Sequence, residues 1–395
     1  MKVEKSMKFV FAGGGTGGHL YPALAVAELM SDRHPGFEAL FIGTRSGIEA
    51  RVVPESEYRI KFISSRGVRG RGFVGKVITI ASLMVGIVQA SIIILRFKPD
   101  LVFGSGGYAS VAVIISAFIL RKRIVLQEQN SIPGLANRML APCAKKVYLG
   151  FESAREWLKG HKGIKVTGNP LRTQVRQVRM DTGKDSKGEF GLGLDGHVLL
   201  VFGGSQGAAS LNRAATRFIL ENEDIQAIVQ TGKKDFEKVR DELARAGSRV
   251  YVSPYINDIY KAYLAADIAL ARSGALSVSE LIAMSLPAIL VPYPWSADDH
   301  QVHNARAVVR AGGAKMILDE DLNAETLRMA IRDIFDVTGN LENMTKALQE
   351  MGGRGATEAI CDDIEEYLNG KANLGVSEKI DEYDGEIDEG GNDAR

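Results

Sequence analysis

The sequence predicts an α/β protein of two Rossmann-like domains, each built around a parallel sheet, with a cleft between them. Short apolar runs alternate with longer helical patterns along most of the 395 residues, which is the order of elements in parallel sheets with right-handed crossovers. Two glycine-rich turns, at residues 13–18 and 203–207, each follow an apolar run and lead into a helical pattern. A strand, a glycine turn and a helix N-terminus bind phosphate or sugar hydroxyls through backbone N–H groups. Two such turns indicate an enzyme that joins two bulky substrates.

The strands are predicted from the apolar runs. They lie at residues 9–12, 39–43, 101–104, 124–126 and 146–149 in the first half, and at 198–202, 227–230, 249–252, 267–271 and 288–291 in the second. We place the first domain at residues 7–168 and the second at 169–355, with the junction near Gly168-Asn169-Pro170, followed by a helix at 356–369. The polar residues 181–188 are expected to form a mobile loop. Ligands are expected at the carboxyl ends of the strands.

Composition indicates a folded, soluble protein, because 45% of the residues are hydrophobic, 25% are charged and the formal net charge is +1. Two cysteines provide no disulfide framework, which fits a reducing, cytoplasmic setting. The first residues lack the apolar stretch of a signal peptide. Residues 371–395 carry eight acidic and three basic side chains with few apolar ones, so we predict a disordered acidic tail there. No nucleic-acid partner is expected.

Residues 77–95 contain no charged side chain and are apolar over a length that is borderline for a membrane-spanning helix. Three interpretations are open: a membrane span, a helix buried in the core, and a helix that lies on a bilayer. A weak polar stripe recurs at helical spacing and consists of Thr79, Ser82, Gly86 and Gln89. Basic residues flank this segment and the apolar residues 111–120; they are Arg66, Arg69, Arg71 and Lys76, and Arg121, Lys122 and Arg123. They favour contact with anionic lipid over an ordinary solvated surface.

The first glycine turn has the spacing of a dinucleotide fingerprint at Gly13, Gly15 and Gly18, which by itself is a weak signal. The second strand is followed by Gly43-Thr44-Arg45, without the acidic side chain that would hold a ribose, and this counts against NAD. The absence of a following Gly-Lys-Ser/Thr counts against an ATP-type phosphate loop. His19 comes next, at a predicted helix N-terminus where the dipole favours the neutral imidazole. It is a candidate general base; the alternative is a histidine that only caps the helix or forms hydrogen bonds.

Polar and glycine-rich segments follow two further strands of the first half. Gln127-Glu128-Gln129-Asn130 comes directly after the strand at 124–126, and four consecutive polar side chains are hard to explain as core. Glu128 is a candidate to accept a proton or orient a base, and Asn130 to bind a sugar hydroxyl; the alternative is an ordinary loop. The turn at 104–108 either lets the backbone approach a ligand or serves close packing.

In the second half, Ser273 is predicted to cap the helix that follows the strand at 267–271. Glu280 on that helix is a candidate to hold the two hydroxyls of a ribose, and the alternative is a solvent-facing residue.

A polar segment follows the strand at 288–291 and contains Asp298, Asp299, His300 and His303. Because metal sites normally need three or four clustered ligands, we expect no metal here. Hydrogen bonding to a sugar, through Gln301 and His300, is the preferred interpretation.

Together these segments resemble the membrane-associated glycosyltransferases of peptidoglycan synthesis, the MurG type, from about residue 8 to residue 368. The motifs are Gly-Gly-Thr-Gly-Gly-His at 14–19, Glu-Gln-Asn at 128–130, Gly-Asn-Pro-Leu-Arg at 168–172, Gly-Gly-Ser-Gln-Gly at 203–207, Arg-Ser-Gly-Ala-Leu-Ser-Val-Ser-Glu at 272–280 and His-Gln-Val-His-Asn-Ala at 300–305. One departure is Gln127, where relatives commonly have histidine. This departure argues against a general base at position 127, so the base is expected to be His19 or Glu128.

The resemblance implies a GT-B fold, in which the helix at 356–369 packs back on the first domain, and it implies no cofactor and no metal. The second domain would hold UDP-N-acetylglucosamine, with the uracil at the backbone of Ile256 and the ribose at Glu280. The diphosphate would lie against Arg172, Ser205 and the turn Ala275, Leu276 and Ser277, and Val278 and Ser279 are further candidates for substrate binding. Asn130 and Gln301 would contact the N-acetylglucosamine. The reacting sugars and the lipid diphosphate would lie at Thr16, Gly17, Gly18 and His19.

The implied activity is inverting transfer of N-acetylglucosamine to the C4 hydroxyl of undecaprenyl-pyrophosphoryl-N-acetylmuramoyl-pentapeptide (lipid I), giving lipid II. The implied location is the cytoplasmic face of the inner membrane, as a peripheral enzyme on anionic lipid, with cell-division or elongation proteins as candidate partners. Arg172 and helix N-termini would stabilise the departing diphosphate, and His19 is preferred over Glu128 as the base. The alternatives are a UDP-N-acetylglucosamine 2-epimerase, a transferase with another lipid acceptor such as diacylglycerol, and a membrane scaffold that only binds the donor.

Overall fold

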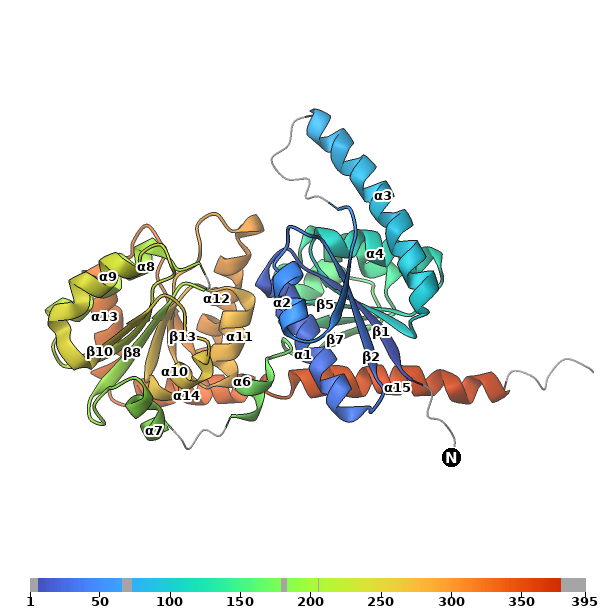
Figure 1. Cartoon of the computed structure of the whole chain (residues 1–395). Coiled ribbons are helices and arrows are strands. Elements are labelled where there is room, and N and C mark those ends of the chain that lie inside the picture. The colour runs from blue at the N-terminus through green and yellow to red at the C-terminus, as the bar shows by residue number, and fades with distance from the viewer. Residues whose placement is uncertain (1–5, 66–72, 179–182, 205, 378–395) are drawn as a thin grey trace, which may run out of the picture.

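The computed structural model describes residues 6–65, 73–178, 183–204 and 206–377, and within these ranges the chain forms two α/β domains that lie side by side (Figure 1). Each domain has one parallel sheet with helices on both faces. The predicted fold class is therefore confirmed.

The first sheet has seven strands in the order β3-β2-β1-β4-β5-β6-β7. The strands are β1 (Lys8–Gly13), β2 (Glu38–Gly43), β3 (Arg59–Phe62), β4 (Leu101–Gly106), β5 (Ile124–Glu128), β6 (Lys146–Leu149) and β7 (Ile164–Val166). The helices are α1 (Gly17–Arg33), α2 (Glu49–Glu55), α3 (Phe73–Phe97), α4 (Tyr108–Ile119), α5 (Leu135–Leu140), η1 (Ala141–Cys143) and η2 (Glu152–Leu158). After Lys8, strand β1 carries no polar side chain because both of its faces are covered. Phe9 and Phe11 pack with α1, whereas Val10 and Ala12 pack with α4.

The second sheet has six strands in the order β10-β9-β8-β11-β12-β13. They are β8 (His197–Phe202), β9 (Ile225–Gln230), β10 (Val250–Ser253), β11 (Ile268–Ala271), β12 (Ala288–Leu290) and β13 (Ala314–Met316). The helices are α6 (Thr173–Gln177), α7 (Gly183–Glu189), α8 (Ala209–Glu221), α9 (Phe236–Leu243), η4 (Ala244–Arg249), α10 (Ile259–Ala265), α11 (Ala275–Ala283), η5 (Ala297–Asp299), α12 (His300–Ala311), α13 (Ala324–Phe335), α14 (Asn340–Met351) and α15 (Ala356–Ser377). Both sheets have Rossmann strand order, so each has a topological switch point, between β1 and β4 and between β8 and β11.

All ten predicted strands are present, but the sequence did not indicate β3, β7 and β13. These are short strands at sheet edges, and each carries a lysine or an arginine. The predictions relied on continuous apolar runs, which strands buried on both faces need and edge strands do not. The prediction of a mobile loop at 181–188 is also wrong for residues 183–188, because residues 183–189 form α7; residues 181 and 182 lie outside the described residues.

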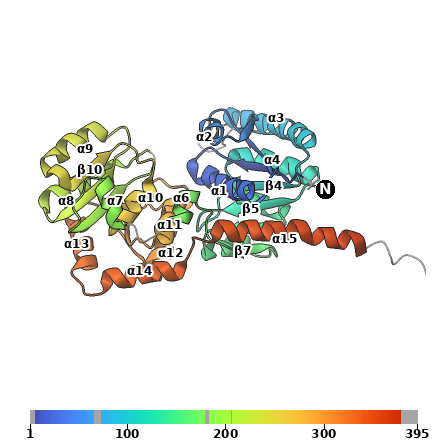
Figure 2. The same ribbon diagram turned by 60° about the horizontal axis from the view of Figure 1, so that its bottom comes forward.

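Helix α15 runs along the first domain, on the same side of the molecule as α14 under the second domain (Figure 2). Ile360, Cys361 and Ile364 are fully buried in the core beside β1 and α1. The helix continues to Ser377, beyond the end predicted at residue 369, so residues 371–377 are helical and not part of a disordered tail. A helix tolerates isolated glycines such as Gly370 at a cost of about 1 kcal/mol each, so the glycines here do not prevent a helix. The acidic residues 378–395 lie outside the described residues.

Asp363 fastens α15 to the first sheet. Its carboxylate accepts hydrogen bonds from Lys146 Nζ at 2.6 Å and Tyr148 OH at 2.8 Å, and it also contacts Lys165 Nζ. Burial on its own raises the pKa of the Asp363 carboxyl, but the three hydrogen bonds outweigh burial and the net pKa is lowered. A lowered pKa in the folded state means that this group stabilises the fold above its ordinary pKa and loses that contribution as the pH falls through the folded value.

We expect Asp363→Asn to lower the free energy of unfolding at pH 7 by about 1–3 kcal/mol, because it leaves two lysines without their carboxylate. The difference from wild type should shrink as the pH is lowered below about 4, where the aspartate itself becomes protonated. Denaturant unfolding at several pH values measures both effects. Asp362→Asn is the matched control, since Asp362 is 65% exposed in its surface pair with Arg33, and such pairs contribute at most about 1 kcal/mol. Equal effects of the two substitutions would contradict the assignment.

Helix α3 packs on the domain through a side that combines part of the polar stripe with apolar residues such as Ala90 and Ile94, and it exposes its other apolar side chains. Thr79 and Gly86 are buried, and Gln89 Oε1 accepts from Ser64 N at 2.7 Å. The exposed apolar residues of α3 and the end of α4, termed here the apolar face, are Ile78, Ile80, Met84, Val85, Val88, Ile92, Leu95, Phe118 and Ile119. Over Ile78–Phe97 the mean hydropathy is 2.3, yet only 22% of that stretch is buried. The interpretation as a buried core helix is therefore wrong.

Candidate active site

The two glycine turns lie at the switch points of the two sheets. In the first domain Ala12 pairs with Gly104 and Gly13 with Gly106, so the turn after β1 lies beside the glycine turn after β4. In the second domain Phe202 pairs with Ala271, so the turn at 203–207 begins beside the segment that starts at Arg272. Ligands of open parallel sheets bind at such positions. Each glycine turn therefore lies beside a second predicted segment of its own domain, the turn at 104–108 in the first and the segment that starts at Arg272 in the second.

His19 is held near the start of α1 by two acceptors. Its Nδ1 lies 3.0 Å from Ser105 O and 2.8 Å from Gln129 Oε1. A Cβ added at Gly106 would lie 3.0 Å from His19 Nδ1, and one added at Gly107 would lie 3.4 Å from Cδ2. Both glycines have positive φ angles, of 97° and 83°. The glycines of the turn after β4 therefore let the backbone pack closely against His19, the candidate base.

The first turn of α1 presents backbone groups at the surface. Thr16 is the N-cap without a side-chain cap hydrogen bond, and Thr16 and Gly18 are exposed while Gly17 is half-buried. Such a turn can contact a negatively charged ligand through its N–H groups.

Glu49 fills the preceding part of the glycine turn, and sequence analysis missed it. Its carboxylate accepts from Gly15 N and from Thr44 N, each at 2.8 Å, and the side chain is buried. A buried carboxylate at this position repels a nucleotide phosphate, which agrees with the exclusion of NAD from the sequence. A Cβ at Gly14 or Gly47 would overlap Glu49, so the glycines make room for this side chain.

The polar run after β5 is part of the core and not a surface loop. Strand β5 continues to Glu128, and Gln127, Glu128 and Gln129 are all at most 1% exposed. Glu128 accepts from Asn130 N at 2.9 Å, Asn130 Nδ2 at 3.2 Å, Gly134 N at 3.0 Å and Asn137 Nδ2 at 2.8 Å. A carboxylate with four donors orders the segment that follows it, and this arrangement favours His19 over Glu128 as a proton acceptor.

Arg172 and Glu280, predicted to hold the diphosphate and the ribose, contact each other. Arg172 Nε and Nη2 donate to Glu280 Oε1 at 3.1 and 2.8 Å, and Tyr263 OH donates to Glu280 Oε2 at 2.8 Å. Burial would lower the pKa of Arg172, but the Glu280 carboxylate outweighs it and the net pKa is raised. Burial and the same carboxylate raise the pKa of Tyr263. The Arg172 guanidinium also lies 5.6 Å from the ring centre of Tyr21 on α1, so this cluster borders the first domain.

Helix α11 begins at Ala275, and its N-cap is Gly274, which has no side chain to cap the first turn. The predicted cap, Ser273, instead donates through Oγ to Gln301 O at 2.8 Å, so that prediction is wrong. Without a side-chain cap, the first-turn N–H groups suit an anion. Leu276 and Ser277 are half-buried. Ala275 and Val278 have their side chains in the core, so only their backbone can contact a ligand.

The remaining predicted residues divide between the two domains. Ile256 N donates to Gln230 Oε1 at 2.9 Å, so a uracil would use its carbonyl or displace Gln230. Gln301 Oε1 accepts from Tyr293 N at 2.9 Å. Ser205 lies outside the described residues. Among the described residues, His300 and the neighbouring Asp298, Asp299 and His303 are not part of any group of three or more metal-ligating side chains.

Asn304 on α12 joins the two domains, and sequence analysis did not single it out. Its Oδ1 accepts from Ser131 N at 2.8 Å, and its Nδ2 lies 3.3 Å from Asn130 Oδ1. Gln301 lies three residues before Asn304 on the same helix, which places the two on one face. Because Asn304 contacts Asn130, this spacing is compatible with one sugar that contacts both Asn130 and Gln301. Asn304 is part of the motif at 300–305, but the spacing of that motif does not show which of its polar residues contacts the other domain.

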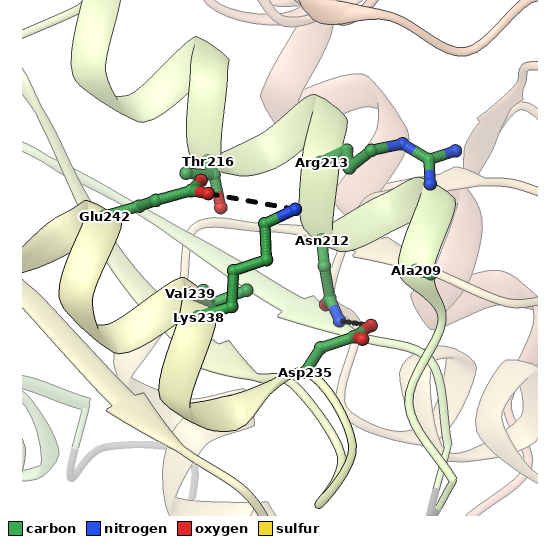
Figure 3. Close-up of a pocket in the computed structure, with 8 residues that line it drawn as sticks. All are labelled: Ala209, Asn212, Arg213, Thr216, Asp235, Lys238, Val239 and Glu242. Atoms are coloured by element: carbon green, nitrogen blue, oxygen red, sulfur yellow. Dashed lines mark hydrogen bonds and ion pairs between the residues drawn. The ribbon is translucent and has the colours of Figure 1, made fainter.

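A separate cavity of about 70 Å³ lies between α8 and α9 (Figure 3). Three of its charged side chains have partners: Lys238 Nζ lies 4.0 Å from Glu242 Oε1, and Asp235 Oδ2 accepts from Asn212 Nδ2 at 2.9 Å. None of the predicted site residues lines it, so it is not the candidate active site.

Comparison with known proteins agrees with this geometry. Residues 9–149 match the Glycosyltransferase family 28 N-terminal domain, and residues 198–360 match the C-terminal domain of the same family. The chain is 38% identical over 363 residues to the UDP-N-acetylglucosamine–N-acetylmuramyl-(pentapeptide) pyrophosphoryl-undecaprenol N-acetylglucosamine transferase of Geobacter sulfurreducens, covering 91% of this chain and 98% of that protein. It is 40% identical over 367 residues to the protein of the same name from Chlorobaculum parvum, with the same coverage.

Solved structures show the same architecture. The crystal structure of Acinetobacter baumannii MurG superposes with a TM-score of 0.72 at 26% identity, covering 91% of this chain and 99% of that one. A UDP-N-acetylglucosamine 2-epimerase from Neisseria meningitidis, bound to UDP-N-acetylglucosamine, has a TM-score of 0.64 at 14% identity and covers 92% of this chain and 100% of that one. The second likeness concerns the fold alone.

Proposed function

Because this chain belongs to glycosyltransferase family 28, and within it to the UDP-N-acetylglucosamine–N-acetylmuramyl-(pentapeptide) pyrophosphoryl-undecaprenol N-acetylglucosamine transferases, we propose that it catalyses the transfer that this name describes. The donor is UDP-N-acetylglucosamine and the acceptor is the undecaprenyl-linked muramoyl-pentapeptide. The epimerase alternative is not favoured, since the epimerase likeness is at 14% identity.

The observation that carries the proposal is the position of the Arg172–Glu280 pair, 5.6 Å from Tyr21 on the helix that also carries His19. It brings groups suited to a nucleotide diphosphate in the second domain next to α1, the helix of the first domain that carries the candidate base. Arg172 and the N-terminus of α11 would bind the negative charge that develops on the departing UDP. His19 would remove the proton from the C4 hydroxyl of N-acetylmuramic acid.

We propose that the transfer inverts the anomeric carbon. The hydroxyl would attack from the face opposite UDP, with the base on one side of the sugar and the leaving-group site on the other, and would form a β-1,4 bond. No metal is needed in this scheme, since the guanidinium and the helix N-terminus supply the positive charge.

A transfer assay with UDP-N-acetylglucosamine and a short-chain lipid I analogue tests the proposal. We expect UDP release that depends on the acceptor, and a β-1,4-linked disaccharide product. Epimerisation of UDP-N-acetylglucosamine without acceptor would favour the epimerase, and transfer to diacylglycerol would favour the other transferase. Donor binding without transfer to the muramoyl acceptor would support a scaffold.

We also propose that the enzyme is peripheral to the cytoplasmic face of the membrane and binds it through the apolar face of α3 and α4. Helix α3 is held along the domain by its inner side, where Ser116 Oγ donates to Ile87 O at 2.9 Å, which favours a helix lying on a bilayer over a span. Arg121 borders this face and is exposed, as suits anionic lipid. The predicted basic residues Arg66, Arg69 and Arg71 lie outside the described residues, and the side chain of Lys76 is not described.

We expect Met84→Asp to weaken binding to vesicles that contain phosphatidylglycerol by about 10-fold or more, because it removes an apolar side chain that would be buried in the bilayer and adds a charge that the anionic lipid repels. Co-sedimentation measures the partition. Met329→Asp is the matched control, because Met329 is 63% exposed, close to the 59% of Met84, and lies on the second domain. Equal binding of the two variants would contradict the assignment of this surface.

A further inference from the structure

A continuous chain of side-chain hydrogen bonds links His19 to helix α11 of the other domain. His19 Nδ1 lies 2.8 Å from Gln129 Oε1, and Gln129 Nε2 lies 2.5 Å from Gln127 Oε1. Gln127 Nε2 lies 2.8 Å from Asn169 Oδ1, and Asn169 Nδ2 lies 2.9 Å from Ser279 Oγ. The chain therefore starts at the candidate base, crosses the domain junction and ends on the donor-site helix.

The three amides of this chain are buried. Gln127 is 0% exposed, and Gln129 and Asn169 are each 1% exposed. A buried amide that loses its partner costs about 1–3 kcal/mol, so these groups strongly favour the paired arrangement.

Backbone carbonyls fix the direction of every bond. Gln129 Nε2 also donates to Ser105 O at 2.8 Å, and Asn169 Nδ2 also donates to Gln129 O at 2.9 Å. Because a carbonyl oxygen can only accept, neither amide can be turned around. Gln127, which lies between them, must then donate to Asn169 and accept from Gln129.

The same argument fixes the tautomer of His19. Its Nδ1 faces two acceptors, Ser105 O and Gln129 Oε1. Nδ1 must therefore carry the hydrogen, and in the neutral ring the lone pair is on Nε2. A general base needs such a lone pair held in one place.

We propose that Gln127, Gln129 and Asn169 are positioning residues for the transfer: they hold His19 with Nδ1 protonated and Nε2 available, and Ser279 ties this arrangement to the docking of the second domain. The assignment of His19 as base rests on the proposed function, whereas the tautomer does not. Gln127 suits the middle of the chain because an amide donates and accepts at once and carries no charge.

Two substitutions of Gln127 test the proposal. Methionine has similar length but neither donates nor accepts, so Gln127→Met should lower kcat by about 10- to 100-fold, the usual cost of a misplaced catalytic group, with a smaller change in KM for UDP-N-acetylglucosamine. A neutral histidine can donate to Asn169 and accept from Gln129, so Gln127→His should recover most of the loss. Wild-type kcat in Gln127→Met, or no recovery in Gln127→His, would overturn the proposal.

A spectroscopic measurement separates this inference from the identity of the reaction. The chain has six histidines, so ¹⁵N-histidine labelling of the full-length protein without substrate, with His19→Gln for assignment, reports the tautomer of His19. We expect protonated Nδ1 in the wild type and a mixture of tautomers in Gln127→Met. Protonated Nε2 in the wild type would overturn the inference, whereas the expected tautomer in a protein without transfer activity would refute only the proposed function.

Gln226→Met is the matched control. Gln226 is 8% exposed and forms hydrogen bonds to the backbone of Gly193 and Asp195, at the end of β9 away from the glycine turns. Its replacement should lower stability but leave kcat and the His19 tautomer as in the wild type. A tautomer change in this variant too would mean that general loosening, and not the chain of amides, controls His19.

Discussion

Replacing Arg172 by alanine is expected to lower kcat about 100- to 1000-fold, the usual cost of removing one donor that stabilises charge in the transition state. Glu280 holds the guanidinium through Nε and Nη2 before any substrate arrives. A positive charge that is already in place needs no reorganisation when charge develops on the departing diphosphate. Steady-state kinetics of UDP release, with circular dichroism to show an intact fold, provide the measurement.

Two further arginine variants identify the origin of this loss. Arg172→Lys keeps the charge but loses the planar two-point contact, so we expect activity between those of the wild type and Arg172→Ala. Arg176 is buried and paired with Glu358 at 2.7 Å, so Arg176→Ala should cost stability while the folded enzyme keeps its kcat. Near-normal turnover of Arg172→Ala would remove this residue from the mechanism.

Replacing His19 by glutamine is expected to lower kcat about 100- to 10,000-fold, the usual contribution of a general base. Glutamine keeps a polar side chain of similar length, so the packing against Gly106 and Gly107 should survive. The measurement is kcat/KM as a function of pH. The acid limb of the wild-type profile, where the base becomes protonated, should disappear in the variant.

The comparison with Glu128 decides which residue is the base. Glu128→Gln should disturb the segment that Glu128 orders but should keep the acid limb of the profile. If Glu128→Gln abolishes that limb and His19→Gln retains it, the assignment is reversed. His161→Gln is the matched histidine control, because His161 also has two hydrogen-bond partners, Ala144 O at 3.0 Å and Gly163 N at 3.1 Å, and lies outside the candidate site.

For helix α3, composition predicts an apolar helix but does not predict which of its sides is buried. The sequence marks residues 77–95 as apolar and uncharged, and from that a core helix and a bilayer helix are equally good interpretations. Only packing reveals that Thr79 and Gly86 face the domain while Ile80 and Met84 face outward. Which side of a helix is buried depends on what it packs against, and that partner, α4, is a separate element of the chain.

The sequence by itself determined the strand–helix alternation, and with it the parallel sheets and the two glycine turns that follow strands; the strand order, and hence the two switch points, came from the structure. The alternation and the turns follow from local patterns, because a short apolar run of strand length between turns is typical of a strand buried on both faces. Tertiary structure alone decided that Gln127 and Gln129 form a buried chain and not a loop, since their partners Asn169 and His19 lie 42 and 110 residues away. A buried amide is acceptable only where another segment supplies its hydrogen bonds, and local sequence does not contain that information.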